Sequence, residues 1–514
     1  MADPSTTPLP LTGELSLDAI THGYYWDTSG SNTLYWSLSH NLPESLVWNN
    51  PQNTVQSLQS LFDVYEGFID VDFVYAGFFD DPGAAYTAGS DINVSLYNDT
   101  VNLAWAYAND PNSALNTSEY PGAPGDAFLN IASAANSLDS YDPGSAGWFL
   151  MLHQLGHSLG LKHPHDDGGT GRPTVQQFGD GQFDTSWMTV MAYNDDYAFT
   201  GADINPETPM ALDVLGLQSI YGANVNTNAG DNIHNITTTQ AYETLWDAGG
   251  VDTLDASASN EGWNIALPSN IGVSDDVGYA IPSSEVAQEF PQTLYWILGE
   301  IESVTGSLYA DRILGNEQSN TLNGGQGDDY LDGSQGIDIA VFSGNAAEYT
   351  IETGENSTFL TGPDGYDQVV NIERFSFDDG YRAIDHSGSG GQAYRLYQAA
   401  FDRTPDAAGV GFWMSKIDNG MSLEEAGSRF IDSDEFRSLY GSDATDYEFL
   451  EALYANVLDR APDGDGFDWW LGQLDTNPDK TREKVLADFS ESAENVANVY
   501  ENIATGFAYD LWVV

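Results

Sequence analysis

Hydrophobic positions along the chain follow three different periods, and the first is that of a mixed α and β domain. In residues 51–68 apolar side chains recur with helical spacing, and Thr54 is the expected N-terminal cap. Short apolar runs typical of strands follow at Val71–Ala76, Ile92–Leu96, Leu103–Tyr107 and Ala127–Ile131. Residues 145–160 then form an apolar segment between a serine and a glycine, which predicts a buried helix. We expect an α+β domain over residues 1–224, closed by a helix within 209–224.

From about residue 225 the composition changes to Gly, Asp, Asn and Thr with short apolar runs. A nine-residue period begins at Gly306, Gly315, Gly324 and Gly333. Its eighth position is apolar throughout and is expected to point inward: Ile313, Leu322, Leu331 and Ala340. The period matches the nonapeptide of a parallel β-roll, in which two repeats make one coil. The sequence therefore predicts a β-roll domain within residues 225–388.

The repeats also supply candidate calcium ligands. Because two repeats form a coil, Asp311 should face Asp329, and Asn320 should face Asp338, across calcium ions. The ligand candidates in the repeats are Asp311, Asn320, Gly325, Gly327, Asp329, Gly336 and Asp338.

A separate acidic loop, residues 246–255, precedes the repeats. Asp247 and Asp252 flank a bend at Gly249 and Gly250 that would expose carbonyl oxygens, so calcium binding is expected there too. A plain turn without an ion is the alternative interpretation.

The third period lies near the C-terminus. The segment from Tyr397 to Asp418 recurs as Tyr454–Asp475, 57 residues later. Helical spacing before and after an R-x-P-D break predicts two helical hairpins in an all-α domain over residues 389–514. The loop 463–466 is expected to cap a helix, with calcium binding as the less favoured alternative. The segment resembles a helical module of uncharacterised function in secreted bacterial repeat proteins.

Charge narrows the choice of partners. The chain has 78 acidic and 14 basic residues, a formal charge of −64, and no cysteine. From Met1 to Asp311 the only lysine and arginine are Lys162 and Arg172. Repulsion disfavours nucleic acid and anionic membranes, and divalent cations are the expected counterions. No disulfide is possible, and no apolar run is long enough to span a membrane.

Three histidines carry the chemistry that the sequence suggests. His153 and His157 are four residues apart in the predicted helix, so both imidazoles share one face. Gly160 allows a sharp turn that would bring His163 to the same point. Three neutral imidazoles with an open fourth position are what a catalytic zinc ion requires.

The stretch HQLGHSLGLKHP resembles the HExxHxxGxxH signature of the metzincin zinc endopeptidases, and of the serralysins in particular. Residues 186–193 resemble the family's Met-turn, with Met191 beneath the zinc. The resemblance implies a secreted, calcium-stabilised endopeptidase that hydrolyses peptide bonds in proteins. It also implies that Tyr193 ligates zinc and stabilises the transition state, and that a short N-terminal propeptide is removed.

One residue departs from this pattern. Position 154 should be the glutamate that acts as general base, and here it is Gln154. A neutral amide cannot take up a proton, so we expect metal binding to persist and activity to be very low. An engineered replacement and a natural loss of catalysis both explain it, and the otherwise intact site favours the first. The alternative function is a catalytically silent, secreted, calcium-dependent binding or surface-attachment protein.

The last residues, Asp510–Val514, resemble the acidic-then-apolar tail that type I secretion machinery reads. The N-terminus shows no export signal of the Sec type, so we expect secretion through the C-terminal signal. We further expect a monomer that acts on protein or peptide substrates. A cell-surface component bound by the helical module is a further candidate partner.

Overall fold

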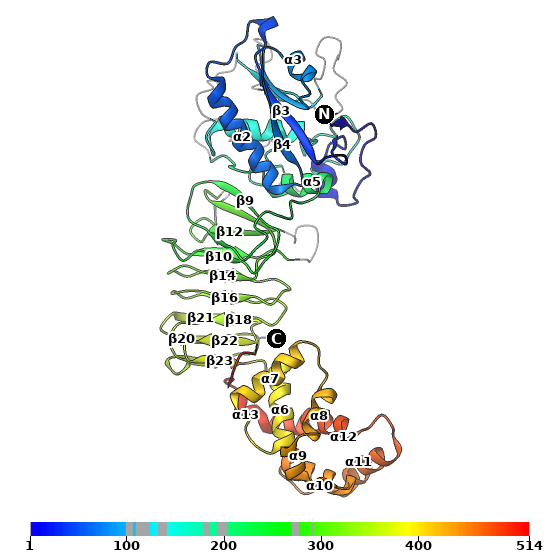
Figure 1. The fold of residues 1–514 in the computed structure, drawn as a ribbon. Coiled ribbons are helices and arrows are strands. Elements are labelled where there is room, and N and C mark those ends of the chain that lie inside the picture. Colours follow the sequence, from blue (N-terminus) through cyan, green and yellow to red (C-terminus); the bar gives the residue numbers. More distant parts are fainter. Residues whose placement is uncertain are drawn as a thin grey trace. The chain divides into compact units, whose positions relative to one another are not determined.

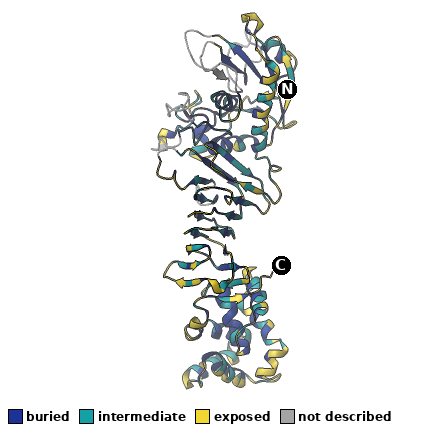
Figure 2. Cartoon of the chain, turned by 90° about the vertical axis from the view of Figure 1, so that its left-hand side faces the viewer, coloured by how far each residue is buried: buried dark blue, intermediate teal, exposed yellow. Residues whose placement is uncertain are grey.

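The computed structural model describes residues 2–98, 106–108, 111, 124–131, 141–178, 184–192, 204–269, 277–288 and 291–512. The chain divides into two compact units, Met1–Leu254 with Asn264–Ile301 and Asp255–Trp263 with Glu302–Val514. Figure 1 shows the helices and strands of both units, and Figure 2 shows that each unit contains buried residues of its own. Within the described ranges no helix combines the length and hydropathy needed to cross a bilayer.

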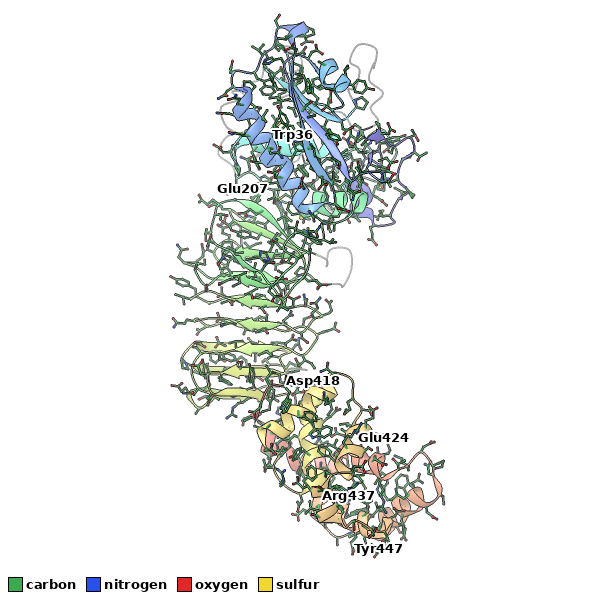
Figure 3. The ribbon with its side chains drawn as sticks, viewed as in Figure 1. Trp36, Glu207, Asp418, Glu424, Arg437 and Tyr447 are labelled. Atoms are coloured by element: carbon green, nitrogen blue, oxygen red, sulfur yellow. The ribbon has the colours of Figure 1, made fainter. Side chains whose placement is uncertain are left out.

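The first unit contains a five-stranded sheet covered by helices. In spatial order its strands are β4 (Asp72–Phe79), β3 (Thr33–Ser39), β5 (Ile92–Tyr97), β7 (Ala127–Asn130) and β6 (Ala106–Ala108). Neighbouring strands are parallel except β6, which runs antiparallel to β7. Trp36 of β3, labelled in Figure 3, is fully buried. Its ring stacks on Phe62 of the long helix α2 (Pro51–Phe68), with 4.7 Å between the ring centroids.

Helix α2 spans Pro51–Phe68, as its apolar periodicity predicts, but the expected cap is wrong. Asn50, not Thr54, is the N-cap, and its side chain accepts a hydrogen bond from Asn53 N. Pro51 explains the difference, because proline favours the first helical position and so makes the preceding residue, Asn50, the cap.

The first unit contains further helices and strands. They are β1 (Asp3–Pro4), α1 (Leu15–Ile20), β2 (Trp26–Asp27), α3 (Pro82–Thr87), α4 (Ala146–Ser158), α5 (Ala211–Tyr221), β8 (Ile233–Asn235), β9 (Tyr242–Asp247), β12 (Gly278–Pro282) and β13 (Leu294–Gly299). β10 (Thr253–Asp255) and β11 (Trp263–Ala266) lie where the chain passes between the units.

The second unit begins with a parallel β-roll. One face stacks β14 (Ser303–Thr305), β16 (Thr321–Asn323), β18 (Ile339–Val341) and β22 (Arg374–Phe377), and the other stacks β15 (Arg312–Leu314), β17 (Tyr330–Asp332) and β21 (Gly365–Val370). Arg312 pairs with Tyr330 and Ser303 with Thr321, so each coil contains two nonapeptides. The four eighth-position side chains are at most 1% exposed, which confirms that they point inward.

Antiparallel strands complete both faces of the roll. β19 (Thr350–Thr353) and β20 (Thr358–Gly362) extend one face beyond β21. β23 (Gly380–Ala383) pairs with β22 and with β24 (Phe507–Tyr509), so the chain returns to the roll after the helices.

Eight helices lie between β23 and β24 in the described chain. They are α6 (Ser389–Phe401), α7 (Ala407–Asp418), α8 (Leu423–Ile431), α9 (Asp434–Tyr440), α10 (Asp446–Leu458), α11 (Gly464–Thr476), α12 (Arg482–Ser490) and α13 (Ala493–Ile503). The expected all-α repeat is therefore present (Figure 1).

The repeated R-x-P-D segment has a structural explanation. In the second copy the Arg460 guanidinium lies 5.0 Å from the Tyr454 ring centroid, and the Asp463 carboxylate caps α11 by accepting a hydrogen bond from Gly466 N at 2.7 Å. The first copy repeats the geometry, with Arg403 5.0 Å from the Tyr397 centroid. The expected helix-capping turn is confirmed.

The roll should depend on its inward side chains. Leu331→Ala removes a fully buried side chain from β17 and should destabilise the calcium-loaded roll by about 2–5 kcal/mol. Leu308→Ala, in a residue that is 59% exposed, is the matched control and should cost less than about 0.5 kcal/mol. Urea unfolding in saturating calcium measures both. Equal effects of the two substitutions would contradict the inward packing.

Candidate metal centre

Helix α4 presents two of the three histidines. Its N-cap is Ser145, whose Oγ accepts a hydrogen bond from Trp148 N at 3.1 Å. Apolar side chains cover most faces of α4, and the helix is therefore largely buried. His153 on this helix is only 3% exposed. His157 follows one turn later on the same face. The predicted helix and its serine cap are confirmed.

The third histidine arrives through a tight turn. Gly160 has φ of +101°, and a Cβ at this position would lie 2.5 Å from Tyr24 O, so glycine is required. His163 Nε2 then lies 3.0 Å from His157 Nε2 and 3.3 Å from His153 Nε2. Ligands of a tetrahedral zinc ion with Zn–N of about 2.0–2.1 Å are separated by about 3.3 Å, so these spacings fit a shared ion. The structure thus brings the three predicted residues together.

Each imidazole is held by its other nitrogen. His153 Nδ1 lies 2.7 Å from Val190 O, and His157 Nδ1 lies 3.0 Å from Leu161 O. His163 Nδ1 lies 2.9 Å from a carboxylate oxygen of Asp166. An acceptor at Nδ1 keeps the proton there and leaves the Nε2 lone pair for a metal. The sequence interpretation missed Asp166, although an acidic residue three positions after His163 is visible in the sequence.

Electrostatics favour the neutral imidazoles that a metal needs. Burial, together with the neighbouring histidines, lowers the pKa of His153 to about 3 and the pKa of His157 well below its usual value. The hydrogen bond with His163 lowers the pKa of the Asp166 carboxyl to about 2, so that group is ionised. Two buried imidazoles with lowered pKa values, beside a third imidazole that a carboxylate orients, suit a divalent transition metal.

The segment that resembles the Met-turn packs against α4 and is hydrogen-bonded to α5. Met191 is fully buried, and its sulfur occupies the space that a Cβ on Gly156 would need. Asp213 of α5 accepts hydrogen bonds from Thr189 Oγ1 at 2.5 Å and from Val190 N at 2.7 Å. Burial raises the pKa of Asp213 to about 7. Because Val190 O holds His153, α5 supports the first histidine through this turn.

Gln154 follows His153 on α4 and is 3% exposed. Its Oε1 atom is buried and accepts no hydrogen bond from the part of the chain that the structure describes. A buried amide oxygen without a partner fits a site designed to hold a polar ligand. Tyr193, the other residue expected to contact the metal, lies outside the described residues.

A histidine from outside the predicted acidic loop lies beside the two aspartates of that loop. His234 Nε2 lies 2.6 Å from Asp247 Oδ2, and donor atoms of His234, Asp247 and Asp252 all lie within 4.8 Å of one another. Both carboxylates are fully buried. Gly249 and Gly250 have φ of +130° and +153°, conformations that favour glycine. The sequence interpretation missed His234 because it lies outside the acidic loop.

In the roll, carboxylates stack from coil to coil. Asp329 Oδ1 accepts a hydrogen bond from Asp311 N at 2.8 Å, and Asp338 Oδ1 accepts one from Asn320 N at 2.7 Å. The two members of each predicted pair are therefore in contact between neighbouring coils. The same pattern continues past the repeats to Asp367, whose Oδ1 accepts from Asp329 N at 3.0 Å.

Glu373 continues the second stack, accepting from Asp338 N at 2.9 Å. The sequence interpretation missed Asp367 and Glu373 because neither obeys the nine-residue period. Asp338 Oδ2 and Asp367 Oδ2 are buried and lack hydrogen-bond partners within the described ranges. Unpartnered carboxylate oxygens in stacked turns fit hard cations such as calcium.

The glycines of the turns make this stacking possible. Gly325, Gly327 and Gly336 have φ of +90°, +136° and +120°. A Cβ on any of them would lie within 2.6 Å of backbone atoms in the neighbouring coil. Only glycine permits this approach of backbones, as the repeat requires.

Two segments of the chain match the models of known protein families. Residues 305–340 match the RTX calcium-binding nonapeptide repeat, which confirms the predicted period. Residues 427–499 match a domain of unknown function, DUF4214, within the helical region.

Particular relatives match about a third of the chain. Metallopeptidase AprA of Pseudomonas marginalis is 30% identical over 35% of this chain and 40% of its own length. Serralysin of Proteus mirabilis is 32% identical over 35% of the chain and 37% of its own length. Serralysin C of Dickeya chrysanthemi is 33% identical over 31% of the chain and 35% of its own length. The matched segments thus span about two fifths of these relatives, and the N-terminal domain is serralysin-like.

Titration of the roll should be coupled to its stability. Burial, the largest cause, raises the pKa of Asp329 to about 7 and the pKa of Asp338 to about 8, from an ordinary value near 4. Because the folded state then binds more protons than the unfolded state, stability without calcium should fall as pH rises from about 4 to about 8.

Thermal unfolding in a calcium chelator at pH 5, 6, 7 and 8 measures this dependence. The midpoint of the roll should fall steadily with pH, and saturating calcium should restore it most at pH 8, where the carboxylates are ionised. A chelated roll that is most stable at pH 8 would contradict the assignment of buried, protonated carboxylates.

Proposed function

We propose that the chain is a secreted zinc endopeptidase of the serralysin type, stabilised by calcium and silenced by Gln154. The observation that carries the proposal is the convergence of three imidazoles on α4 and the following turn, each held by a contact at its Nδ1 atom. Similarity to metalloproteases over a third of the chain supports it.

His153, His157 and His163 are the proposed zinc ligands, and Tyr193 is the proposed fourth protein group. When bound, zinc would polarise a peptide carbonyl and lower the pKa of a water molecule. The protein's own contribution is to keep each Nε2 unprotonated and aimed inward, through the three Nδ1 hydrogen bonds.

Residue 154 decides whether this geometry catalyses hydrolysis. A glutamate would accept a proton from the attacking water and return it to the departing amine. Gln154 has nearly the same size and stands in the same buried position, yet an amide cannot accept that proton. Metal binding and proton transfer are therefore separable under this proposal.

The roll supplies stability outside the cell. Its stacked carboxylates repel one another until calcium binds, and sites of the extracellular type have affinities of about 10⁻⁴–10⁻³ M. The proposed calcium ligands in the repeats are those predicted from the sequence: Asp311, Asn320, Gly325, Gly327, Asp329, Gly336 and Asp338. Asp367 and Glu373, which lie after the repeats, are proposed in addition. The roll would fold where calcium is abundant, which supports secretion through the C-terminal tail.

Restoring the base is the decisive experiment. Gln154→Glu should raise hydrolysis of casein and of an internally quenched peptide by about 10²–10⁴-fold, because general acid–base catalysis is restored. The activity should vanish with a zinc chelator and return with added zinc. Gln177→Glu, an exposed change of the same chemistry, is the matched control and should leave activity at its starting level.

Metal analysis on the same preparations separates the possible results. One zinc per chain should be present in the parent and in Gln154→Glu, and absent in His157→Ala. A zinc-loaded Gln154→Glu chain that cleaves no peptide would refute the enzymatic proposal. Retention of intact peptide by that chain would instead support the alternative of a silent binding protein.

A further inference from the structure

The two cations of the long N-terminal stretch are both buried beside the metal centre. Lys162 is 2% exposed and Arg172 is 6% exposed, although these types are usually found at the surface. Neither belongs to the set of proposed metal ligands. Their burial in a stretch that contains no other lysine or arginine calls for a structural cause.

The Lys162 ammonium joins the turn that carries His163 to the N-terminal segment. Nζ donates to Ala19 O at 2.5 Å, and to Asp166 O and Pro173 O at 2.7 and 3.1 Å. It also lies 3.3 Å from the carbonyl oxygen of His163 itself. Carbonyl oxygens from four places in the chain thus converge on one charged donor, a strong class of hydrogen bond.

Arg172 makes the second attachment, ten residues further on. Its Nη1 donates to Thr21 Oγ1 at 2.7 Å and its Nη2 donates to Leu9 O at 2.7 Å. Asp18 lies 3.7 Å away as a buried counterion. Gly23 is needed beside it, because a Cβ there would lie 2.6 Å from the Arg172 side chain.

The N-terminal segment also contacts the backbone between the second and third histidines. Lys162 N donates to Ile20 O, and His22 N donates to Gly160 O, each at 2.8 Å. Trp26 Nε1 donates to Ser158 O at 2.9 Å. From Ser158 to Lys162 the turn is therefore bound along its length by residues 20–26.

We infer that residues 9–26 are a permanent positioning element of the metal centre, which fixes His163 through the Lys162 ammonium and the Arg172 guanidinium. The inference rests on the proposed function, since it concerns the third zinc ligand. Removing one set of supporting contacts around a ligand typically lowers metal affinity by about 10–100-fold.

Substitution of the ammonium tests this role. Lys162→Met keeps the length of the side chain but leaves its carbonyl partners without the charged donor. Zinc affinity, measured by competition with a chromophoric chelator, should fall about tenfold or more, and the visible spectrum of the cobalt-substituted site should shift. Lys480→Met, which removes an ammonium paired with Asp488 in the second unit, is the matched control and should change neither.

Hydrogen exchange on the unsubstituted chain tests the same inference without a variant. Because coupling between two sites is reciprocal, zinc binding should slow amide exchange in peptides covering residues 9–26 as well as in those covering the histidines. Protection confined to residues 146–192 would overturn the inference, as would a Lys162→Met chain with the parental zinc affinity and cobalt spectrum. Absence of zinc binding in the parent chain would instead refute the proposed function.

Discussion

The first unit depends on one arrangement, three imidazoles whose Nε2 atoms meet while each Nδ1 is anchored elsewhere. The anchors come from the Met-turn, from the turn after α4 and from the loop after His163. His163 Nε2 lies 3.0 Å from His157 Nε2 and 3.3 Å from His153 Nε2, and the contacts at Nδ1 hold the three rings in this arrangement. Asp213, Lys162 and Arg172 are best understood as supports for the anchors.

Both units bury charged side chains, which most globular proteins keep at the surface. The two units differ in which charged groups they bury. The first unit buries its few cations against backbone carbonyls, as the four contacts of the Lys162 ammonium illustrate. The roll buries aspartates in stacks, and two of their oxygens have no hydrogen-bond partner among the described residues. Burial of an unpaired carboxylate is costly, so the roll needs either protons or cations to be stable.

In the proposed enzyme, metal binding and proton transfer would be carried by different residues. Gln154 stands at the position proposed for proton transfer, while the donor atoms of His153, His157 and His163 lie within 4.8 Å of one another. In the helical region, by contrast, the most repetitive motif is structural. Arg403 and Arg460 pack over tyrosine rings and the following aspartates cap helices, which accounts for the R-x-P-D repeat without a ligand.

Local periodicity determined much of this protein: the spacing of His153 and His157 placed them on one helical face, and the nonapeptide period placed residues 18 apart in register. Tertiary structure decided the rest. Asp367 and Glu373 join the stacks from outside the period, and Lys162 meets Ala19 across 143 residues. Such contacts depend on how finished elements pack, and no pattern among neighbouring residues encodes that packing.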